Sequence, residues 1–139
     1  MLSNYLSSNR QALGLDPARI KYVIVTHGHS DHYGGSRYIQ QKFGAKLVAS
    51  ASDWGMMTTP LAGSPFAKLV PPRKDMVASD GDKIVLGRTT VTLFVTPGYT
   101  PGTLSLIFPV FDKGVRHMAG RMGAAAATQP PRSVSRSSR

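Results

Sequence analysis

The alternation of apolar and polar positions predicts a mixed α/β arrangement in the first half of the chain. Residues 20–26 (IKYVIVT) form a β-branched, continuously apolar run of strand length, which indicates a buried strand rather than an edge strand. A polar, glycine-bearing loop, HGHSDHYGG, follows this run. The pattern then predicts a helix over residues 35–43, a strand over 46–49, and a helix that begins at Ser50 or Ser52 and ends near Met57. This order of elements is typical of an α/β protein.

The second half of the chain is richer in short strands. Residues 59–74 hold four of the ten prolines and predict a surface loop, and a short helix is expected much earlier, over residues 2–13. Alternating residues predict strands over 83–86, 89–96, 103–110 and 115–118, with turns at 80–82 and 112–114. Beyond Gly120 the run RMGAAAATQPPRSVSRSSR has no apolar periodicity. We therefore expect one domain over residues 1–120 and a disordered, basic, low-complexity tail over residues 121–139.

Composition limits the chemistry that this chain can perform. At 139 residues there is room for one hydrophobic core. The absence of cysteine removes disulfides, thiolate ligands and cysteine nucleophiles, which leaves histidine and carboxylate as the strong metal ligands. No apolar stretch approaches the length of a membrane span, and the amino terminus lacks the basic start and apolar core of a signal peptide. We expect no membrane partner, and the compartment stays open.

The net charge of +10 would suggest a nucleic-acid partner if it were spread over the whole chain. From Lys113 onward, however, there are six basic residues and no acidic residue, whereas the first 112 positions hold eleven basic and seven acidic residues. The excess charge is therefore mostly a property of the tail. Because the arginines of the tail lack interleaved aromatic residues, the sequence argues against a nucleic-acid partner.

The segment THGHSDH concentrates the chemistry of the chain. His27 and His29 lie two residues apart, so in an extended loop both imidazoles point the same way and can grip one metal ion. Asp31 and His32 follow one turn later and can face a second metal ion from the other side. Imidazoles and a carboxylate suit zinc and also tolerate iron or manganese. The alternative is an ordinary polar loop, but three histidines and an aspartate directly after an apolar strand favour metal binding.

This cluster matches the H-x-H-x-D-H motif of the metallo-β-lactamase superfamily, which the chain resembles, at His27, His29, Asp31 and His32. The resemblance extends to DGDKIVLGRTTVTLFVTPG and to TPGTLSLIF, and it covers about residues 12–110. It implies an α/β fold of the αββα sandwich type, from the lactamase-like branch. The N-terminal strands and the C-terminal part of that fold are missing, so we expect an incomplete sandwich, either a fragment or the product of a degraded gene.

The resemblance also implies a ligand set for two zinc ions. In the family, the two motif histidines share the first metal with a third histidine in a T-P-G-H-T loop, but this chain reads T-P-G-Y-T and has Tyr99 there. The second metal would be held by Asp31, His32 and a late histidine, which is absent because His117 lies in the wrong element. Four of the six protein ligands remain, so we expect substoichiometric zinc.

Tyr99 leaves two interpretations open. It could be a phenolate ligand or an oxyanion donor, or it could be a lost ligand. A phenol ionises only near pH ~10 and its oxygen lies further from the backbone than an imidazole nitrogen, so the chemistry favours a lost ligand. In a complete site, metal-bound hydroxide, oriented by Asp31 as the catalytic residue, would attack a carbonyl.

The resulting prediction is a zinc-dependent hydrolase that cleaves an amide or ester-type bond, with a small-molecule substrate of the lactam, ester or thioester class. The two missing ligands leave its activity open. A metal-binding pseudoenzyme or fragment is the first alternative, and stoichiometric zinc without turnover would favour it. A nucleic-acid-processing relative is the second alternative. The oligomeric state stays open.

Overall fold

The computed structural model describes residues 14–59, 63, 65 and 68–124 of the chain. The helix expected over residues 2–13 lies outside them, as does the tail from residue 125 onward. The elements in chain order are the 3-10 helix η1 (Pro17–Arg19), β1 (Tyr22–Ile24), α2 (Ser30–Tyr33), α3 (Ser36–Phe43), β2 (Lys46–Ser50), α4 (Ala51–Thr58), β3 (Met76–Ala78), β4 (Lys83–Leu86), β5 (Thr89–Val95), β6 (Leu104–Asp112) and β7 (Val115–Arg121).

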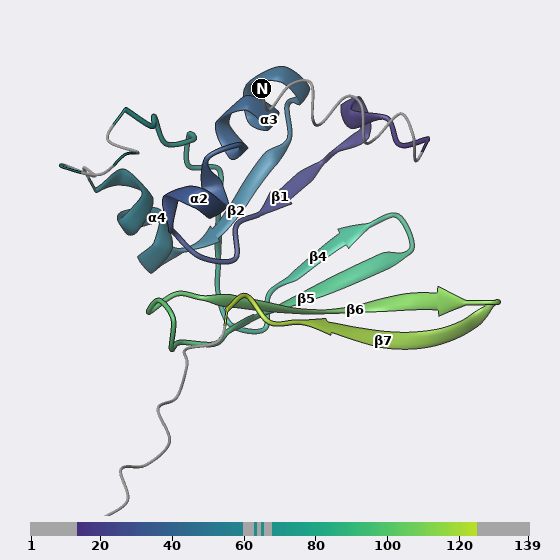
Figure 1. Cartoon of the computed structure of the whole chain (residues 1–139). Coiled ribbons are helices and arrows are strands. Elements are labelled where there is room, and N and C mark those ends of the chain that lie inside the picture. Colours follow the sequence, from purple (N-terminus) through teal and green to yellow (C-terminus); the bar gives the residue numbers. More distant parts are fainter. Residues whose placement is uncertain (1–13, 60–62, 64, 66–67, 125–139) are drawn as a thin grey trace, which may run out of the picture.

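The strands form two sheets, and the helices lie on one side of them (Figure 1). The first sheet is parallel, with the order β1-β2-β3, and the second is antiparallel, with the order β4-β5-β6-β7. Helices α2, α3 and α4 cover the outer face of the parallel sheet, whose inner face packs against the antiparallel sheet (Figure 1). The predicted α/β class and the sandwich of two sheets are confirmed.

Strand β2 is the centre of both hydrophobic cores. Its residues alternate between the two faces of the parallel sheet, as side chains on a strand must. Leu47 and Ala49 pack with Trp54 and Met57 in the core under the helices. Val48 packs with Leu93 in the core between the sheets. Because β2 serves two cores, its last four residues are all buried.

The inner face of the antiparallel sheet follows the alternation of its sequence. In β5 the odd-numbered residues Val91, Leu93 and Val95 belong to the core between the sheets, and the threonines Thr90 and Thr92 face the other way. In the part of the chain that the structure describes, no helix covers the outer face of this sheet (Figure 1).

Three details differ from the sequence-based expectations. Within the apolar run over residues 20–26, only β1 is a strand. It is half-buried and pairs only with β2 among the described strands, so the prediction of a buried strand is wrong. A continuous apolar run was misleading because β1 borders a core on each face, with Val23 on the helix side and Ile24 on the side of the second sheet. The polar loop after β1 contains the short helix α2, and β3, only three residues long, was missed.

Other boundaries agree closely with the predictions. Helix α4 begins after Ser50, whose side chain accepts a hydrogen bond from the backbone N–H of Asp53 at 3.2 Å, which is the N-cap arrangement expected. Strand β7 extends to Arg121, and the described chain continues to Ala124, a few residues into the segment expected as the tail. None of the described helices is long and apolar enough to cross a membrane.

Candidate metal centre

The histidine motif lies where the parallel sheet gives way to the helical layer. Thr26, two residues after the end of β1, accepts a backbone hydrogen bond from Leu104 of β6 at 2.8 Å, which ties the start of the motif to the second sheet. His29 then caps α2, and its carbonyl accepts hydrogen bonds from the N–H groups of His32 and Tyr33 at 3.0 and 3.2 Å. The turn of α2 therefore brings His32 back toward the histidines that precede it.

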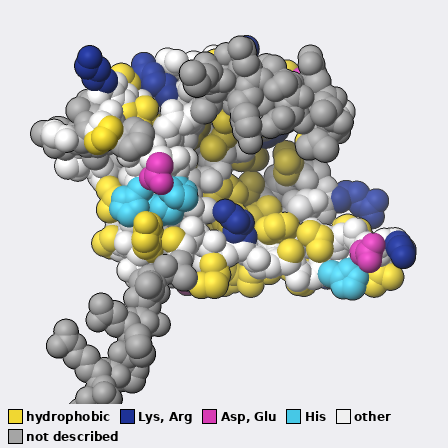
Figure 2. All heavy atoms as spheres, viewed as in Figure 1, with side chains coloured by type: hydrophobic (Ala, Val, Ile, Leu, Met, Phe, Trp, Pro, Cys, Tyr) yellow, Lys and Arg dark blue, Asp and Glu magenta, His cyan; other side chains and the backbone are white. Residues whose placement is uncertain are grey.

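The three motif histidines form one cluster of rings. The ring centroid of His27 lies 3.8 Å from that of His32 and 5.0 Å from that of His29. Asp31 lies beside the cluster, with its Oδ2 3.6 Å from Nε2 of His32, and both side chains are exposed. Figure 2 shows histidine and acidic side chains together at the left of the view, between the helical layer and the antiparallel sheet. The structure thus brings all four predicted ligands into one small region.

His27 is the buried member of the cluster. It is only 1% exposed, and among the described residues its Nε2 has no hydrogen-bond partner, while its Nδ1 lies 3.4 Å from the hydroxyl of Thr26. Burial lowers the pKa of His27, and positive charge on His32 and His29 lowers it further, whereas Asp31 and the nearby backbone of Gly123 oppose this shift. A buried, neutral imidazole with a free nitrogen has the chemistry of a metal ligand.

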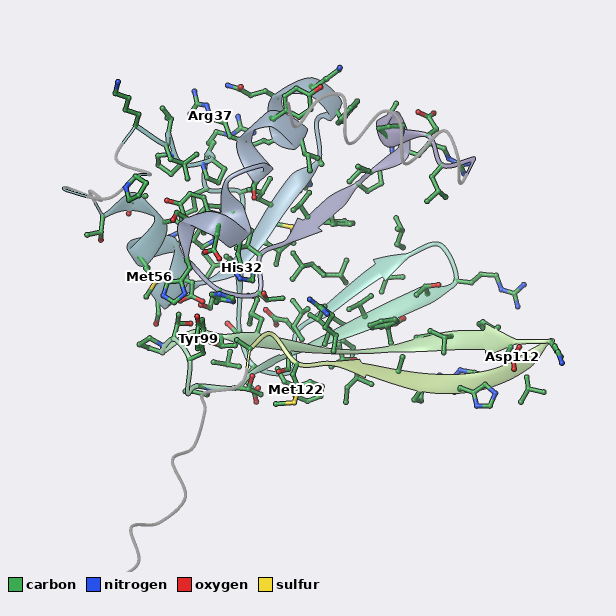
Figure 3. All side chains as sticks on the ribbon, in the orientation of Figure 1. His32, Arg37, Met56, Tyr99, Asp112 and Met122 are labelled. Atoms are coloured by element: carbon green, nitrogen blue, oxygen red, sulfur yellow. The ribbon has the colours of Figure 1, made fainter. Side chains whose placement is uncertain are left out.

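Tyr99 joins the cluster from the other sheet. It belongs to the loop between β5 and β6, and its ring centroid lies 4.9 Å from that of His27 and 5.0 Å from that of His29, edge-on to both. Its side chain is nearly half exposed. In Figure 3, His32 lies on the side of the helical layer and Tyr99 on the side of the antiparallel sheet. His117, in contrast, lies on β7 opposite Val110, outside this cluster.

The floor of the site contains residues that the sequence analysis did not select. Asp53 of α4 is fully buried, and its Oδ2 accepts a hydrogen bond from the hydroxyl of Thr100 at 3.1 Å. Burial raises the pKa of Asp53. Thr100 in turn shares a hydrogen bond of 2.8 Å with Thr103, and both threonines are buried. From sequence, Asp53 reads as an ordinary acidic residue in the first turn of a capped helix, so nothing marked it.

The donor types fit zinc, although the side chains are not arranged as a finished metal centre. Across residues 14–59, 63, 65 and 68–124, no group of three histidine or acidic side chains is placed so that it could hold a metal ion. The rings of His27 and His32 are instead tilted against each other by 48°. What supports the fit is the buried, unpartnered Nε2 of His27 and the set of imidazole and carboxylate donors around it.

Comparison with known sequences places this geometry in context. The sequence pattern of the metallo-beta-lactamase superfamily matches residues 4–110. The chain is 32% identical over 90 residues to a hydroxyacylglutathione hydrolase of Acidiphilium cryptum, a match that covers 65% of this chain and 31% of that protein. It is 35% identical over 120 residues to an uncharacterised protein of Mycobacterium tuberculosis, covering 80% of this chain and 50% of the relative.

Solved structures give the same result. A subclass B3 metallo-β-lactamase of Bradyrhizobium japonicum matches with a TM-score of 0.73 and 32% identity, covering 84% of this chain and 46% of that enzyme. The metallo-β-lactamase GOB-18 of Elizabethkingia meningoseptica matches with a TM-score of 0.75 and 28% identity, covering 88% and 48%. The chain thus spans at most about half the length of each of these relatives.

Proposed function

The chain belongs to the metallo-β-lactamase superfamily, and we propose that it is a zinc-binding hydrolase that cleaves a carbonyl bond of a small molecule. The metal would be held by His27 and His29, with Asp31 and His32 beside them. One observation carries this proposal: three imidazoles converge on one region around His27, whose Nε2 is buried and has no partner among the described residues. A buried nitrogen without a partner costs free energy unless a ligand satisfies it.

Zinc would supply Lewis acidity and a nucleophilic water at neutral pH. The protein's own contribution comes from the exposed side of the cluster. The carboxylate of Asp31 is 66% exposed, so it can orient a water molecule and accept its proton at the surface of the site. Tyr99 is also exposed, and its ring covers His27 and His29 from the side of the second sheet. We assign Asp31 the catalytic role and Tyr99 the position of a lost ligand.

The substrate class follows from the names of the relatives. One is a hydroxyacylglutathione hydrolase and others are β-lactamases, one of them described as a di-zinc enzyme. We propose a lactam, ester or thioester as the substrate. These compounds share an activated carbonyl, whose oxygen a metal ion would polarise and whose carbon a water molecule would attack.

Zinc affinity tests the proposal directly. Competition with a chelator is measured for the full chain, for His27→Ala and for His117→Ala, which removes an exposed histidine of β7 outside the cluster. We expect His27→Ala to abolish the zinc binding of the full chain and His117→Ala to leave it unchanged. Equal affinities in all three chains would contradict the proposed site.

Tyr99 decides how complete the first metal site is. Tyr99→His should tighten zinc binding by an amount on the order of several kcal/mol, since three imidazoles are a common catalytic zinc set. Tyr99→Phe should change nothing if Tyr99 is a lost ligand. If Tyr99→Phe weakens binding markedly and Tyr99→His does not strengthen it, the phenol oxygen is itself a ligand.

A metal-binding pseudoenzyme is the second candidate, and the ring of Tyr99 against two predicted ligands favours it. Turnover of a panel of lactams, esters and thioesters separates the two functions. The zinc-loaded chain should hydrolyse at least one of these compounds, and Asp31→Asn should reduce the rate while the zinc held by His27 and His29 stays bound. Stoichiometric zinc with no turnover would establish the pseudoenzyme instead.

A further inference from the structure

The beginning of α4 lies directly beneath the histidine motif. Gly28, between two of the predicted ligands, is buried against this helix. A Cβ atom at Gly28 would lie only 2.9 Å from the carbonyl oxygen of Asp53 and 3.0 Å from Cβ of Met56. Only glycine allows so close an approach, so the motif loop rests on the segment of α4 that contains Asp53.

Asp53 also reaches the loop that carries Tyr99. Its Oδ2 accepts the hydrogen bond of Thr100, the residue that follows Tyr99, and Thr100 is linked to Thr103 at the start of β6. These three side chains are buried, so water does not compete for their hydrogen bonds. The carboxylate of Asp53 therefore links α4 to the loop between β5 and β6.

The other oxygen of the Asp53 carboxylate, Oδ1, is not held by a comparable hydrogen bond. Asp53 is 0% exposed, and no donor in the part of the chain that the structure describes makes a well-aligned hydrogen bond to its Oδ1, although the backbone N–H of Gly28 lies close to the carboxylate. A buried carboxylate oxygen without a partner is destabilising, and Asp53 belongs to neither hydrophobic core cluster. Burial raises the pKa of Asp53, while Thr100, the charge of His29 and the N–H of Gly28 lower it. The carboxylate is therefore close to the motif loop as well as to Thr100.

We propose that Asp53 is a positioning residue for the metal centre, which ties the loop of His27 and His29 to the loop of Tyr99. This inference rests on the proposed zinc site. Asp53 does not touch the metal: Oδ2 fixes Thr100, and Oδ1 is the acceptor available to the motif loop. Carboxylates behind metal ligands orient them, and their loss typically weakens metal binding about 10- to 100-fold.

A pair of matched variants of the full chain tests the proposal. Asp53→Asn keeps the shape of the side chain but replaces one acceptor oxygen with a donor, so it cannot serve both loops. Asp75→Asn makes the same change in a carboxylate that accepts hydrogen bonds from Leu47 and Gln40 instead. Each variant is titrated with zinc against a chelator, its cobalt(II) form is examined by visible absorption, and its melting temperature is measured.

We expect Asp53→Asn to weaken zinc about tenfold or more and to shift the cobalt spectrum. Asp75→Asn should lower the melting temperature but change neither the affinity nor the spectrum. Equal zinc affinity in Asp53→Asn and the parent, or an equal loss in Asp75→Asn, overturns the proposal. If Asp53→Asn does not fold, Thr100→Val replaces it, and the proposal then requires weaker zinc binding in that variant.

The ring resonances of His29 and Tyr99 in the metal-free chain separate this proposal from the proposed function. Asp53→Asn, or Thr100→Val in its place, should shift both sets of resonances, and Asp75→Asn should shift neither. If the parent chain binds no zinc but these resonances shift, the proposed function fails while the positioning role of Asp53 stands. If they do not shift, Asp53 does not hold the two loops together.

Discussion

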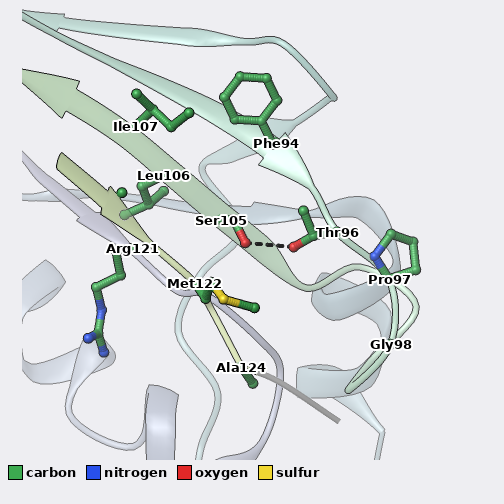
Figure 4. A pocket seen from close by; sticks show the side chains of 11 residues that line it. Phe94, Thr96, Pro97, Gly98, Ser105, Leu106, Ile107, Arg121, Met122 and Ala124 are labelled. Carbon is green, nitrogen blue, oxygen red and sulfur yellow. Dashed lines mark hydrogen bonds between the residues drawn. The ribbon is translucent and has the colours of Figure 1, made fainter. Parts of the chain in front are cut away.

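The two sheets of this protein differ in how many of their faces are buried. The parallel sheet is covered by helices on one face and by the second sheet on the other, and the last four residues of β2 are buried. The antiparallel sheet buries only its inner face, and Phe111, Val115 and Met118 of its last hairpin are between 55% and 67% exposed. Its outer face carries an open groove of about 720 Å³, lined by Phe94, Ile107, Met122 and their neighbours (Figure 4).

This difference in burial shows which sheet positions the predicted metal ligands. The groove lining contains no histidine or acidic residue, although Pro97 and Gly98 at its rim lead directly into Tyr99. The histidines lie on the opposite side of that loop, above the well-packed parallel layer. The positions of the predicted ligands therefore depend on the parallel sheet, which is covered on both faces (the covered sheet). The antiparallel sheet, which is open on its outer face (the exposed sheet), supplies only the loop of Tyr99 and the threonines beneath it.

The largest expected effect tests the covered sheet. Leu47→Ala removes a fully buried side chain of β2 and should lower the free energy of unfolding by about 2–5 kcal/mol. Phe111→Ala, in the exposed hairpin, should change it by less than about 0.5 kcal/mol. Urea unfolding followed by circular dichroism measures both. Similar losses would mean that the two sheets contribute equally to stability despite their different burial.

The second prediction concerns Gly123, just after β7, whose backbone lies near the ring of His27. Gly123 is buried, and a Cβ atom there would collide with the carbonyl oxygen of Leu104 and lie 2.9 Å from Cγ2 of Thr103. Gly123→Ala should therefore destabilise the chain by roughly 1–3 kcal/mol. Gly120→Ala is the matched control, because its Cβ would meet nothing closer than the carbonyl oxygen of Leu106 at 4.0 Å. Equal unfolding midpoints for the two variants would contradict this.

The third prediction is a pH dependence of stability that comes from Asp75, whose carboxylate accepts a hydrogen bond from Leu47 of β2 in the covered sheet. Burial alone raises the pKa of Asp75, but hydrogen bonds from Leu47, Gln40 and Arg73 outweigh it and hold the pKa below the usual 3.8. A depressed carboxyl pKa stabilises the fold above the unfolded-state value, and this stabilisation is lost as the pH falls through the folded-state value.

Asp75→Asn should therefore cost about 1 kcal/mol at neutral pH, and the difference from the parent should shrink below about pH 4. Unfolding free energies at several pH values measure it. A difference that is constant down to pH 2 would show that the charge of Asp75 is not what matters.

The smallest expected effect is that of the tail. Removing residues 125–139 should leave the unfolding transition unchanged, since the sequence of this segment has little apolar surface to bury. Removing residues 121–139 should be costly, because this deletion also takes away Arg121 of β7 and Gly123, which is packed against β6. Two truncated chains compared by thermal melting decide this. Equal melting temperatures would return the domain boundary to Gly120, as expected from the sequence.

The sequence by itself determined the features that depend on neighbouring residues. The spacing within HGHSDH was enough to predict that His27, His29 and His32 come together, because one short turn joins them. The alternation of β5 and the cap of α4 at Ser50 were likewise local, since each depends on contacts within a few positions. The assignment of these histidines to zinc stays a prediction.

Only the tertiary structure showed that Asp53 and Thr100 lie beneath that cluster. Their hydrogen bond links residues 47 positions apart, whereas the contact of Tyr99 with His27, which crosses from one sheet to the other, was expected from the family resemblance. The partial burial of β1 was also decided at this level, because among the described strands β1 pairs with β2 alone while hydrophobic cores border both of its faces. Such contacts depend on how two sheets and a helix pack, and no spacing along the chain encodes that packing on its own.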